Sequence, residues 1–147
     1  RKPSLVGWSL GGIYARELAR HFPDDVRQVI TLGSPFRDSA ATNASWLSRL
    51  LNGRPDRDHS DLRARVGEPL SVPTTSIFSR TDGVVAWRSC LDEESGSCQN
   101  IEIVSSHIGM GHHPIALAII ADRLAQPEGS FAPFRPGFWT RLGVVTS

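Results

Sequence analysis

Short apolar stretches alternate with glycine-, proline- and charge-rich segments along this chain. The stretches over residues 26–32 (VRQVITL) and 72–79 (VPTTSIFS) are rich in β-branched residues and end at turn-forming residues, so each is predicted to be a strand. Residues 101–104 (IEIV) predict a further short strand. Residues 3–6 are too few for a periodicity, but they lead into glycines and then a helical pattern, as a buried strand does.

Apolar residues at helical spacing predict two longer helices. Over residues 10–22, Leu10, Tyr14 and Leu18 lie on one face and charged residues on the other, and the following proline ends the helix. Over residues 114–126 the first position is a proline, which suits the first turn of a helix.

A third, shorter helix is expected between residues 43 and 51. Asn43 can cap its start, and apolar side chains then recur four residues apart, as Trp46 with Leu50 and Leu47 with Leu51. The highly charged run after residue 53 is interpreted as a solvated segment.

Strands that alternate with helices predict an α/β fold, a parallel sheet flanked by helices. Residues 127–147 are rich in proline, glycine and aromatic residues and show no periodicity. We therefore expect an irregular C-terminal tail that drapes over the domain or is loose at its end.

Composition narrows the classes of function. The 147 residues include 16 Lys and Arg against 15 Asp and Glu, a net charge of +1, which gives no support for a nucleic-acid partner. The longest apolar run is far shorter than the roughly 20 residues of a membrane-spanning helix, so no transmembrane segment is expected. No secretory signal pattern opens the sequence, and the compartment stays open.

The two cysteines, Cys90 and Cys98, flank a short polar loop. Their spacing suits a small disulfide in an oxidising compartment and equally suits two free thiols in the cytosol. Three histidines lie close together at positions 107, 112 and 113, but neither an HExxH motif nor paired Cys-x-x-Cys motifs accompany them. We expect neither a metal site nor a cofactor.

The five residues from Gly7 to Gly11 (GWSLG) fit the pattern G-x-S-x-G. A nucleophilic serine has to protrude from a sharp turn between a strand and a helix, and the glycines around it remove side chains that would collide. The turn here has a strand before it and a helix after it, with Gly12 as an additional small residue. The backbone N–H of Leu10, at the start of the helix, is a candidate donor for an oxyanion.

An activated serine also needs a base and a group that orients the base. Asp82 follows the strand over 72–79, and His107 follows the strand over 101–104, so the three residue types occur in the chain order Ser, Asp, His at the ends of three strands. The alternatives are Asp92 and Glu93 for the acid, and His112 and His113 for the base. His21 and His59 are interpreted as surface residues.

With these motifs, VGWSLGG, TLGSPF, SRTDGVV and SSHIGMG, the chain resembles the α/β-hydrolase superfamily and, within it, bacterial lipase- and esterase-like members. The resemblance covers roughly residues 1–126. It implies that Ser9, Asp82 and His107 form a catalytic triad, that Leu10 supplies one oxyanion-hole amide, and that residues 36–70 form a lid or cap. It also places Trp8, Trp46, Leu47 and Leu50 at the substrate, although the lid residues among them can equally serve only to pack the lid down.

In that superfamily several strands precede the serine turn, and the second oxyanion amide comes from a loop among them. Ser9 lies almost at the first residue here, so residues 1–126 are expected to be a partial α/β-hydrolase domain, its C-terminal portion, with exposed sheet surfaces. We expect the 147 residues alone to be weakly active or inactive, or to need a missing N-terminal segment or self-association.

The expected function is that of a serine hydrolase cleaving carboxylic esters, with a small-molecule ester or lipid as substrate and an acyl-enzyme intermediate. Acyl transfer to an alcohol uses the same residues, and peptidase or thioesterase action is open to the same machinery. A non-catalytic binding protein that retains the fold is the alternative from a different class.

Overall fold

A four-stranded sheet is the centre of the fold. A computed structural model describes residues 1–37, 65, 67–138 and 143–145. The strands are β1 (Ser4–Trp8), β2 (Gln28–Leu32), β3 (Thr74–Phe78) and β4 (Cys98–Glu102). They lie in the order β1-β2-β3-β4 with every neighbouring pair parallel, which confirms the predicted fold class.

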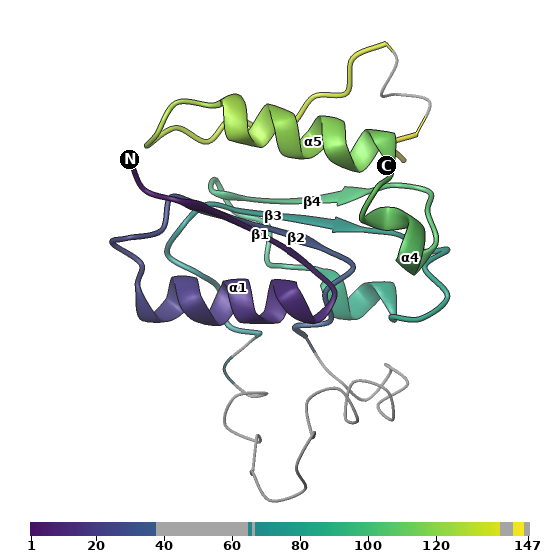
Figure 1. Ribbon diagram of the computed structural model, residues 1–147, viewed down its shortest axis with the longest axis horizontal. Helices are drawn as coiled ribbons and strands as arrows, with labels where there is room; N and C mark the ends of the chain where they lie inside the picture. The colour runs from purple at the N-terminus through teal and green to yellow at the C-terminus, as the bar shows by residue number, and fades with distance from the viewer. Residues whose placement is uncertain (38–64, 66, 139–142, 146–147) are drawn as a thin grey trace, which may run out of the picture.

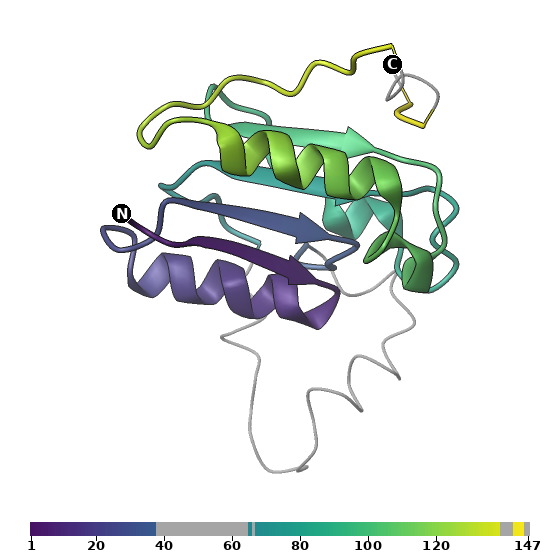
Figure 2. The same cartoon turned by 45° about the horizontal axis from the view of Figure 1, so that its top comes forward.

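Helices cover both faces of this sheet (Figure 1). The helix α1 (Leu10–His21) and the 3₁₀ helix η2 (Trp87–Cys90) lie on one face, and α5 (Pro114–Ala125) lies on the other. The short helix α4 (His107–Met110) lies beyond the carboxyl ends of the strands, the edge toward which the strand arrows point in Figure 2. Ligands of parallel sheets bind at that edge.

Apolar side chains pack the two interfaces between sheet and helices. On the α5 side, buried residues of the strands and the helix form one cluster that includes Ile30, Ile77, Ile101 and Ile119. On the α1 side a smaller cluster includes Ala15, Ala19 and Val29. Both helices therefore hold their strand connections against a rigid sheet.

The last strand lies nearer the N-terminus than the sequence pattern predicts. β4 is Cys98–Glu102 instead of residues 101–104, and its first half is polar. Those polar side chains find partners: Gln99 accepts from the Phe134 N–H at 2.7 Å and donates to its carbonyl at 3.2 Å, and Asn100 bonds both peptide groups of Asp92. Because neighbouring loops supply hydrogen-bond partners, two consecutive polar residues can lie inside this strand. The alternation of apolar and polar residues by which a strand is recognised is therefore missing there.

The described parts of the tail, residues 127–138 and 143–145, contain neither helix nor strand. Phe134 belongs to the apolar cluster under α5, and Val144 packs against that cluster and forms an isolated β-bridge with Ile103. The expected helix over 43–51 lies outside the described residues, as does most of the expected lid. Among the described residues, no helix is both long enough and apolar enough to cross a membrane.

β1 is an edge strand of the described sheet, because it pairs with β2 alone. Large apolar side chains near this edge are exposed, in β1 and along one side of α1: Val6, Trp8, Tyr14, Leu18 and Phe22. Edge strands with exposed apolar neighbours favour association. A missing N-terminal segment or a second copy of the chain, either of which the sequence analysis expects, would bury these side chains. Their burial by such a partner stays a prediction.

Candidate active site

Ser9 lies on the sharp turn between β1 and α1. Its backbone has φ 54° and ψ −122°, the only positive φ outside glycine among the described residues. Such a conformation costs about 1–3 kcal/mol and needs support from its surroundings. Here the Ser9 N–H donates to the Leu32 carbonyl at 2.8 Å, and the Ser9 carbonyl accepts from the Gly12 N–H at 3.1 Å.

Two glycines make this turn possible. A Cβ on Gly7 would overlap the backbone of Gly11 and Gly12, and a Cβ on Gly12 would overlap the side chain of Ser34. A Cβ on Gly11, by contrast, would meet open space. The prediction that small residues surround the serine is correct for Gly7 and Gly12, whereas the space around Gly11 does not require a glycine.

The structure brings Ser9, His107 and Asp82 into one hydrogen-bonded row. The Nε2 atom of His107 lies 3.0 Å from Ser9 Oγ, and its Nδ1 atom lies 2.7 Å from Asp82 Oδ2. The side chains of His107 and Asp82 are 8% and 3% exposed. Water therefore competes little for these bonds, and the three residues come from the ends of β1, β3 and β4.

The environment of Asp82 selects the tautomer of His107. Asp82 Oδ1 accepts from the N–H groups of Val84 at 2.9 Å and Val85 at 2.6 Å, so Oδ2 faces the imidazole. Because a carboxylate only accepts hydrogen bonds, we assign the proton to Nδ1 of the neutral imidazole. Nε2 then presents its lone pair to the hydroxyl of Ser9, as general-base chemistry requires.

The loops that carry the acid and the base are bonded to each other. The buried hydroxyl of Ser79 accepts from the Ser105 N–H at 3.1 Å, Thr81 Oγ1 donates to the Ser105 carbonyl at 3.2 Å, and the His107 N–H donates to the Asp82 carbonyl at 2.9 Å. His107 is also the first residue of a one-turn helix and not part of a loop, because Ser106 caps that turn by accepting from the Gly109 N–H.

Gly33 is a site residue that the sequence analysis missed. It follows β2, the strand between those that precede Ser9 and Asp82, and its φ is +52°. A Cβ there would lie 3.1 Å from Asp82 Oδ2 and 3.3 Å from His107 Nδ1. The missing side chain leaves the space in which the acid and the base meet, and its signal in the sequence is the Gly-Ser-Pro that ends the strand.

The other candidates for acid and base are occupied elsewhere. Asp92 is buried against Arg16, and Glu93 forms an exposed ion pair with Arg37. His112 is exposed, and His113 caps α5 by accepting from the Ile115 N–H.

Arg16 and Asp92 form a buried ion pair on the α1 side of the sheet. Its charged atoms lie 2.5 Å apart, and both side chains are almost fully buried. Arg16 also donates to the Glu68 carbonyl at 2.9 Å, and its guanidinium lies 3.9 Å from the centre of the Phe36 ring. The pair therefore joins α1 to the loop after η2 and to both ends of the segment that was predicted to be the lid.

We expect Asp92→Ala to lower the free energy of unfolding by about 3–5 kcal/mol, because it leaves the buried guanidinium without its carboxylate. The matched control is Glu93→Ala, which breaks a partly exposed pair and is expected to cost about 0–1 kcal/mol. Urea denaturation of both variants measures the difference. Equal losses in the two variants would contradict this account of Asp92.

Of the remaining predicted site residues, the structure describes Leu10 and Trp8. Leu10 is the first residue of α1, so its N–H has no acceptor within the helix and is free to face an oxyanion. The Trp8 indole N–H donates to the carbonyl of His107 at 3.1 Å. The acyl-pocket candidates Trp46, Leu47 and Leu50 lie outside the described residues.

Both cysteines are free thiols in the structure. Burial, with a smaller contribution from the Asp82 carboxylate, raises the pKa of the Cys90 thiol to about 12, and burial also raises the pKa of the Cys98 thiol. A thiol with so high a pKa is a poor nucleophile at neutral pH. Over the described ranges, no group of three or more His, Cys, Asp or Glu side chains is arranged to hold a metal ion.

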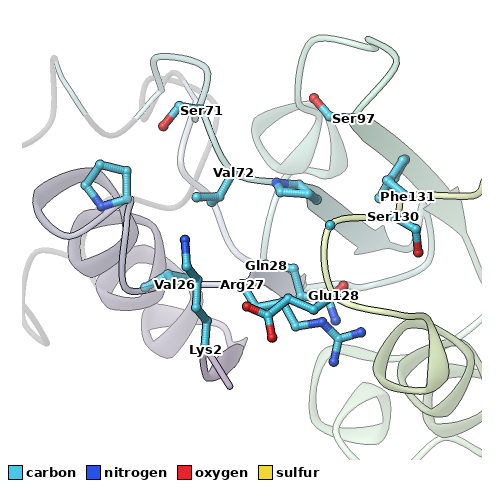
Figure 3. A pocket seen from close by; sticks show the side chains of 13 residues that line it. Lys2, Val26, Arg27, Gln28, Ser71, Val72, Ser97, Glu128, Ser130 and Phe131 are labelled. Carbon is cyan, nitrogen blue, oxygen red and sulfur yellow. The ribbon is translucent and has the colours of Figure 1, made fainter.

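A cavity of about 480 Å³ lies at the opposite end of the sheet, before the strands begin (Figure 3). Lys2, Gln28, Ser97 and Glu128 are among its lining residues. The guanidinium of Arg27, which also lines it, donates to carbonyls at the end of α5, including that of Leu124 at 3.3 Å. This cavity is remote from Ser9, which lies on the turn at the carboxyl edge of the sheet.

No protein-family model matches the chain. Over 84 residues the chain is 32% identical to a GPI inositol-deacylase of Eremothecium gossypii. That match covers 55% of this chain but 8% of the relative's length. The chain therefore spans a small part of this curated relative.

Solved structures resemble the chain over most of its length. An α/β-superfamily hydrolase from Oenococcus oeni matches with a TM-score of 0.58 and 15% identity, over 84% of this chain and 66% of that one. A monoacylglycerol lipase from Paleococcus ferrophilus matches with a TM-score of 0.58 and 16% identity, over 84% and 67%. Human thioesterase 2 matches with a TM-score of 0.53 and 14% identity, over 84% and 71%. At such identities the likeness is one of fold.

Proposed function

We propose that this chain, whose fold is that of the α/β hydrolases, is a serine hydrolase that cleaves carboxylic esters. The observation that carries the proposal is the row of Ser9, His107 and Asp82, with a Ser9 Oγ to His107 Nε2 distance of 3.0 Å. A hydroxyl is a weak nucleophile at neutral pH, and an adjacent base that a third group orients is the arrangement that activates it.

In the proposed reaction, Ser9 Oγ attacks the acyl carbon while Nε2 of His107 takes its proton. Asp82 accepts from Nδ1–H and stabilises the imidazolium. The tetrahedral intermediate collapses as Nε2 returns the proton to the leaving alcohol, which leaves the acyl group on Ser9. Water then attacks the acyl-enzyme while His107 takes its proton, and His107 returns that proton to Ser9 Oγ as the bond to the acyl group breaks and the acid is released.

The backbone N–H of Leu10 is the proposed donor to the oxyanion of the tetrahedral intermediate. It is the first N–H of α1, where the helix leaves its donors unpaired and the helix dipole favours negative charge. One such donor typically contributes about 3–4 kcal/mol to the transition state.

For the substrate we propose an ester with an apolar acyl group. The names of the similar proteins support an acyl substrate, since they include a monoacylglycerol lipase, a thioesterase and a deacylase. Next to His107, Ile108 is an exposed apolar side chain, 72% exposed. Trp46, Leu47 and Leu50 remain the proposed lid contribution to the acyl pocket.

Labelling with a fluorophosphonate probe tests the proposal, because such probes react selectively with activated serines. The folded 147-residue chain is expected to become labelled at neutral pH, with the adduct mapped by mass spectrometry to Ser9. The urea-unfolded chain is the control and is expected to stay unlabelled. A folded chain without any adduct, or with its adduct at another serine, would favour a non-catalytic binding protein. If added alcohol instead of water accepts the acyl group from an ester substrate, the activity is acyl transfer.

A further inference from the structure

Trp8 contacts the backbone of the proposed catalytic histidine. Its indole Nε1–H donates to the His107 carbonyl at 3.1 Å, and the centres of its ring and the imidazole lie 5.7 Å apart, with the ring planes tilted by 37°. On the other side of the turn, Gly111 is close enough that a Cβ there would lie 3.6 Å from the indole. The indole therefore packs on the whole turn that begins at His107.

The backbone N–H and the backbone carbonyl of His107 both form hydrogen bonds, one to Asp82 and the other to the residue before Ser9. The His107 N–H donates to the carbonyl of Asp82, and the His107 carbonyl accepts from Trp8, the residue before Ser9. This backbone path runs parallel to the side-chain path from Ser9 through the imidazole to Asp82. The carboxylate fixes one end of the imidazole, and Trp8 fixes the backbone that carries it.

His107 needs such an anchor because its own element is short. The helix α4 has four residues, too few to be stable by itself. Trp8, in contrast, ends β1 and pairs with Leu32 in the sheet, so the donor belongs to a rigid part of the fold. A displacement of reacting groups by about 1 Å can lower a rate by about 10²-fold.

We propose that Trp8 is a positioning residue, which holds the His107 turn through its indole N–H and so keeps Nε2 within reach of Ser9. This inference rests on the proposed function. It differs from the sequence-based assignment of Trp8 to the substrate site, and the two roles have different kinetics. Loss of a substrate contact raises KM at constant kcat, whereas loss of positioning lowers kcat at constant KM.

Two substitutions in the full chain separate the hydrogen bond from the ring. Trp8→Phe keeps an aromatic ring and removes the donor. Trp8→His keeps a ring N–H, because Nε2 of histidine and Nε1 of tryptophan are separated from Cβ by the same number of bonds. We expect Trp8→Phe to lower kcat for a soluble ester, and the rate of fluorophosphonate labelling, by about 10- to 100-fold with little change in KM. Trp8→His is expected to restore most of this loss.

The matched control is Trp87→Phe. The Trp87 ring stacks on Phe78, with ring centres 5.9 Å apart, and the guanidinium groups of Arg80 and Arg88 lie 4.7 Å and 4.5 Å from its centre. Because these ring contacts involve none of the three residues of the row, the same ring exchange is expected to leave kcat and labelling unchanged. A second readout is independent of activity. Exchange of the His107 amide hydrogen is expected to accelerate at least about tenfold in Trp8→Phe and to return toward the wild-type rate in Trp8→His.

The outcomes separate this inference from the proposed function. If the wild-type chain is labelled and Trp8→Phe is labelled equally fast, or if only KM changes, Trp8 has no positioning role and the hydrolase proposal stands. If the wild-type chain is not labelled, the hydrolase proposal fails, and unchanged amide exchange in Trp8→Phe would overturn the anchoring as well. A loss in Trp8→Phe that Trp8→His does not recover would assign the effect to the ring and overturn the role of the N–H.

Discussion

Ser9→Ala is expected to abolish fluorophosphonate labelling and to reduce ester hydrolysis to the rate without the nucleophile, a loss that reaches about 10⁶-fold in a fully active serine hydrolase. The substitution removes the hydroxyl oxygen that lies 3.0 Å from His107 Nε2. It leaves in place the backbone bond from Ser9 to the Leu32 carbonyl, which holds the turn. Hydrolysis of an activated ester and gel detection of the labelled chain measure the effect.

The control for this variant is Ser4→Ala, at the opposite end of the same strand. Ser4 Oγ accepts from the Gln28 amide, and the strand starts there, far along β1 from the turn. We expect normal labelling of the control variant. Equal labelling of wild type and Ser9→Ala would remove Ser9 from the mechanism and, with it, the proposed function.

Asp82→Asn is expected to lower kcat by about 10⁴-fold with the fold intact. The carbonyl oxygen of the substituted amide can keep the bonds from the N–H groups of Val84 and Val85, so the amide NH₂ then faces His107 Nδ1. A donor at that position favours the tautomer with the proton on Nε2. In that tautomer the imidazole cannot take the proton of Ser9.

Urea unfolding of Asp82→Asn distinguishes this effect from a general loss of structure. We expect the variant to unfold at nearly the wild-type concentration of urea, because its hydrogen bonds to the turn remain. Glu93→Ala, which changes a carboxylate that was an alternative candidate for the acid, is expected to keep full activity. A variant Asp82→Asn with more than a tenth of wild-type kcat would mean that another group orients His107.

The apolar pattern was sufficient for most of the fold. The β-branched runs correspond to β2 and β3, and the helical spacings correspond to α1 and α5, each within a few residues of the predicted limits. The predicted apolar face of α1 is wrong, because Tyr14 and Leu18 are exposed whereas Arg16 is buried against Asp92. The boundary errors occur where tertiary contacts outweigh local pattern. β4 begins in polar residues because Gln99 and Asn100 find partners in loops outside the strand, and α4 forms where a histidine loop was expected because Ser106 caps it.

The candidate site divides in the same way. Ser9, Asp82 and His107 could be chosen from the sequence, because their residue types, their chain order and their positions after predicted strands are all readable from it. Gly33 and the anchoring contact of Trp8 do not follow from order. Gly33 matters because β2 lies between β1 and β3, and Trp8 meets His107 across 99 positions of the chain. The sequence around Gly33 and around Trp8 contains no pattern that predicts their contacts with the Asp82 and His107 region.

The sequence by itself determined the element types, the parallel α/β architecture and the chain order of Ser9, Asp82 and His107 after their strands, because these depend on side-chain chemistry and on periodicity over a few residues. Only the tertiary structure decided the distances. Pairing of the strands from β1 through β4 brings three strand ends to one edge, and the 3.0 Å and 2.7 Å contacts of His107 exist only there. Hydrogen bonds form or fail over tenths of an ångström, and that precision comes from the packed sheet and the loops bonded across it.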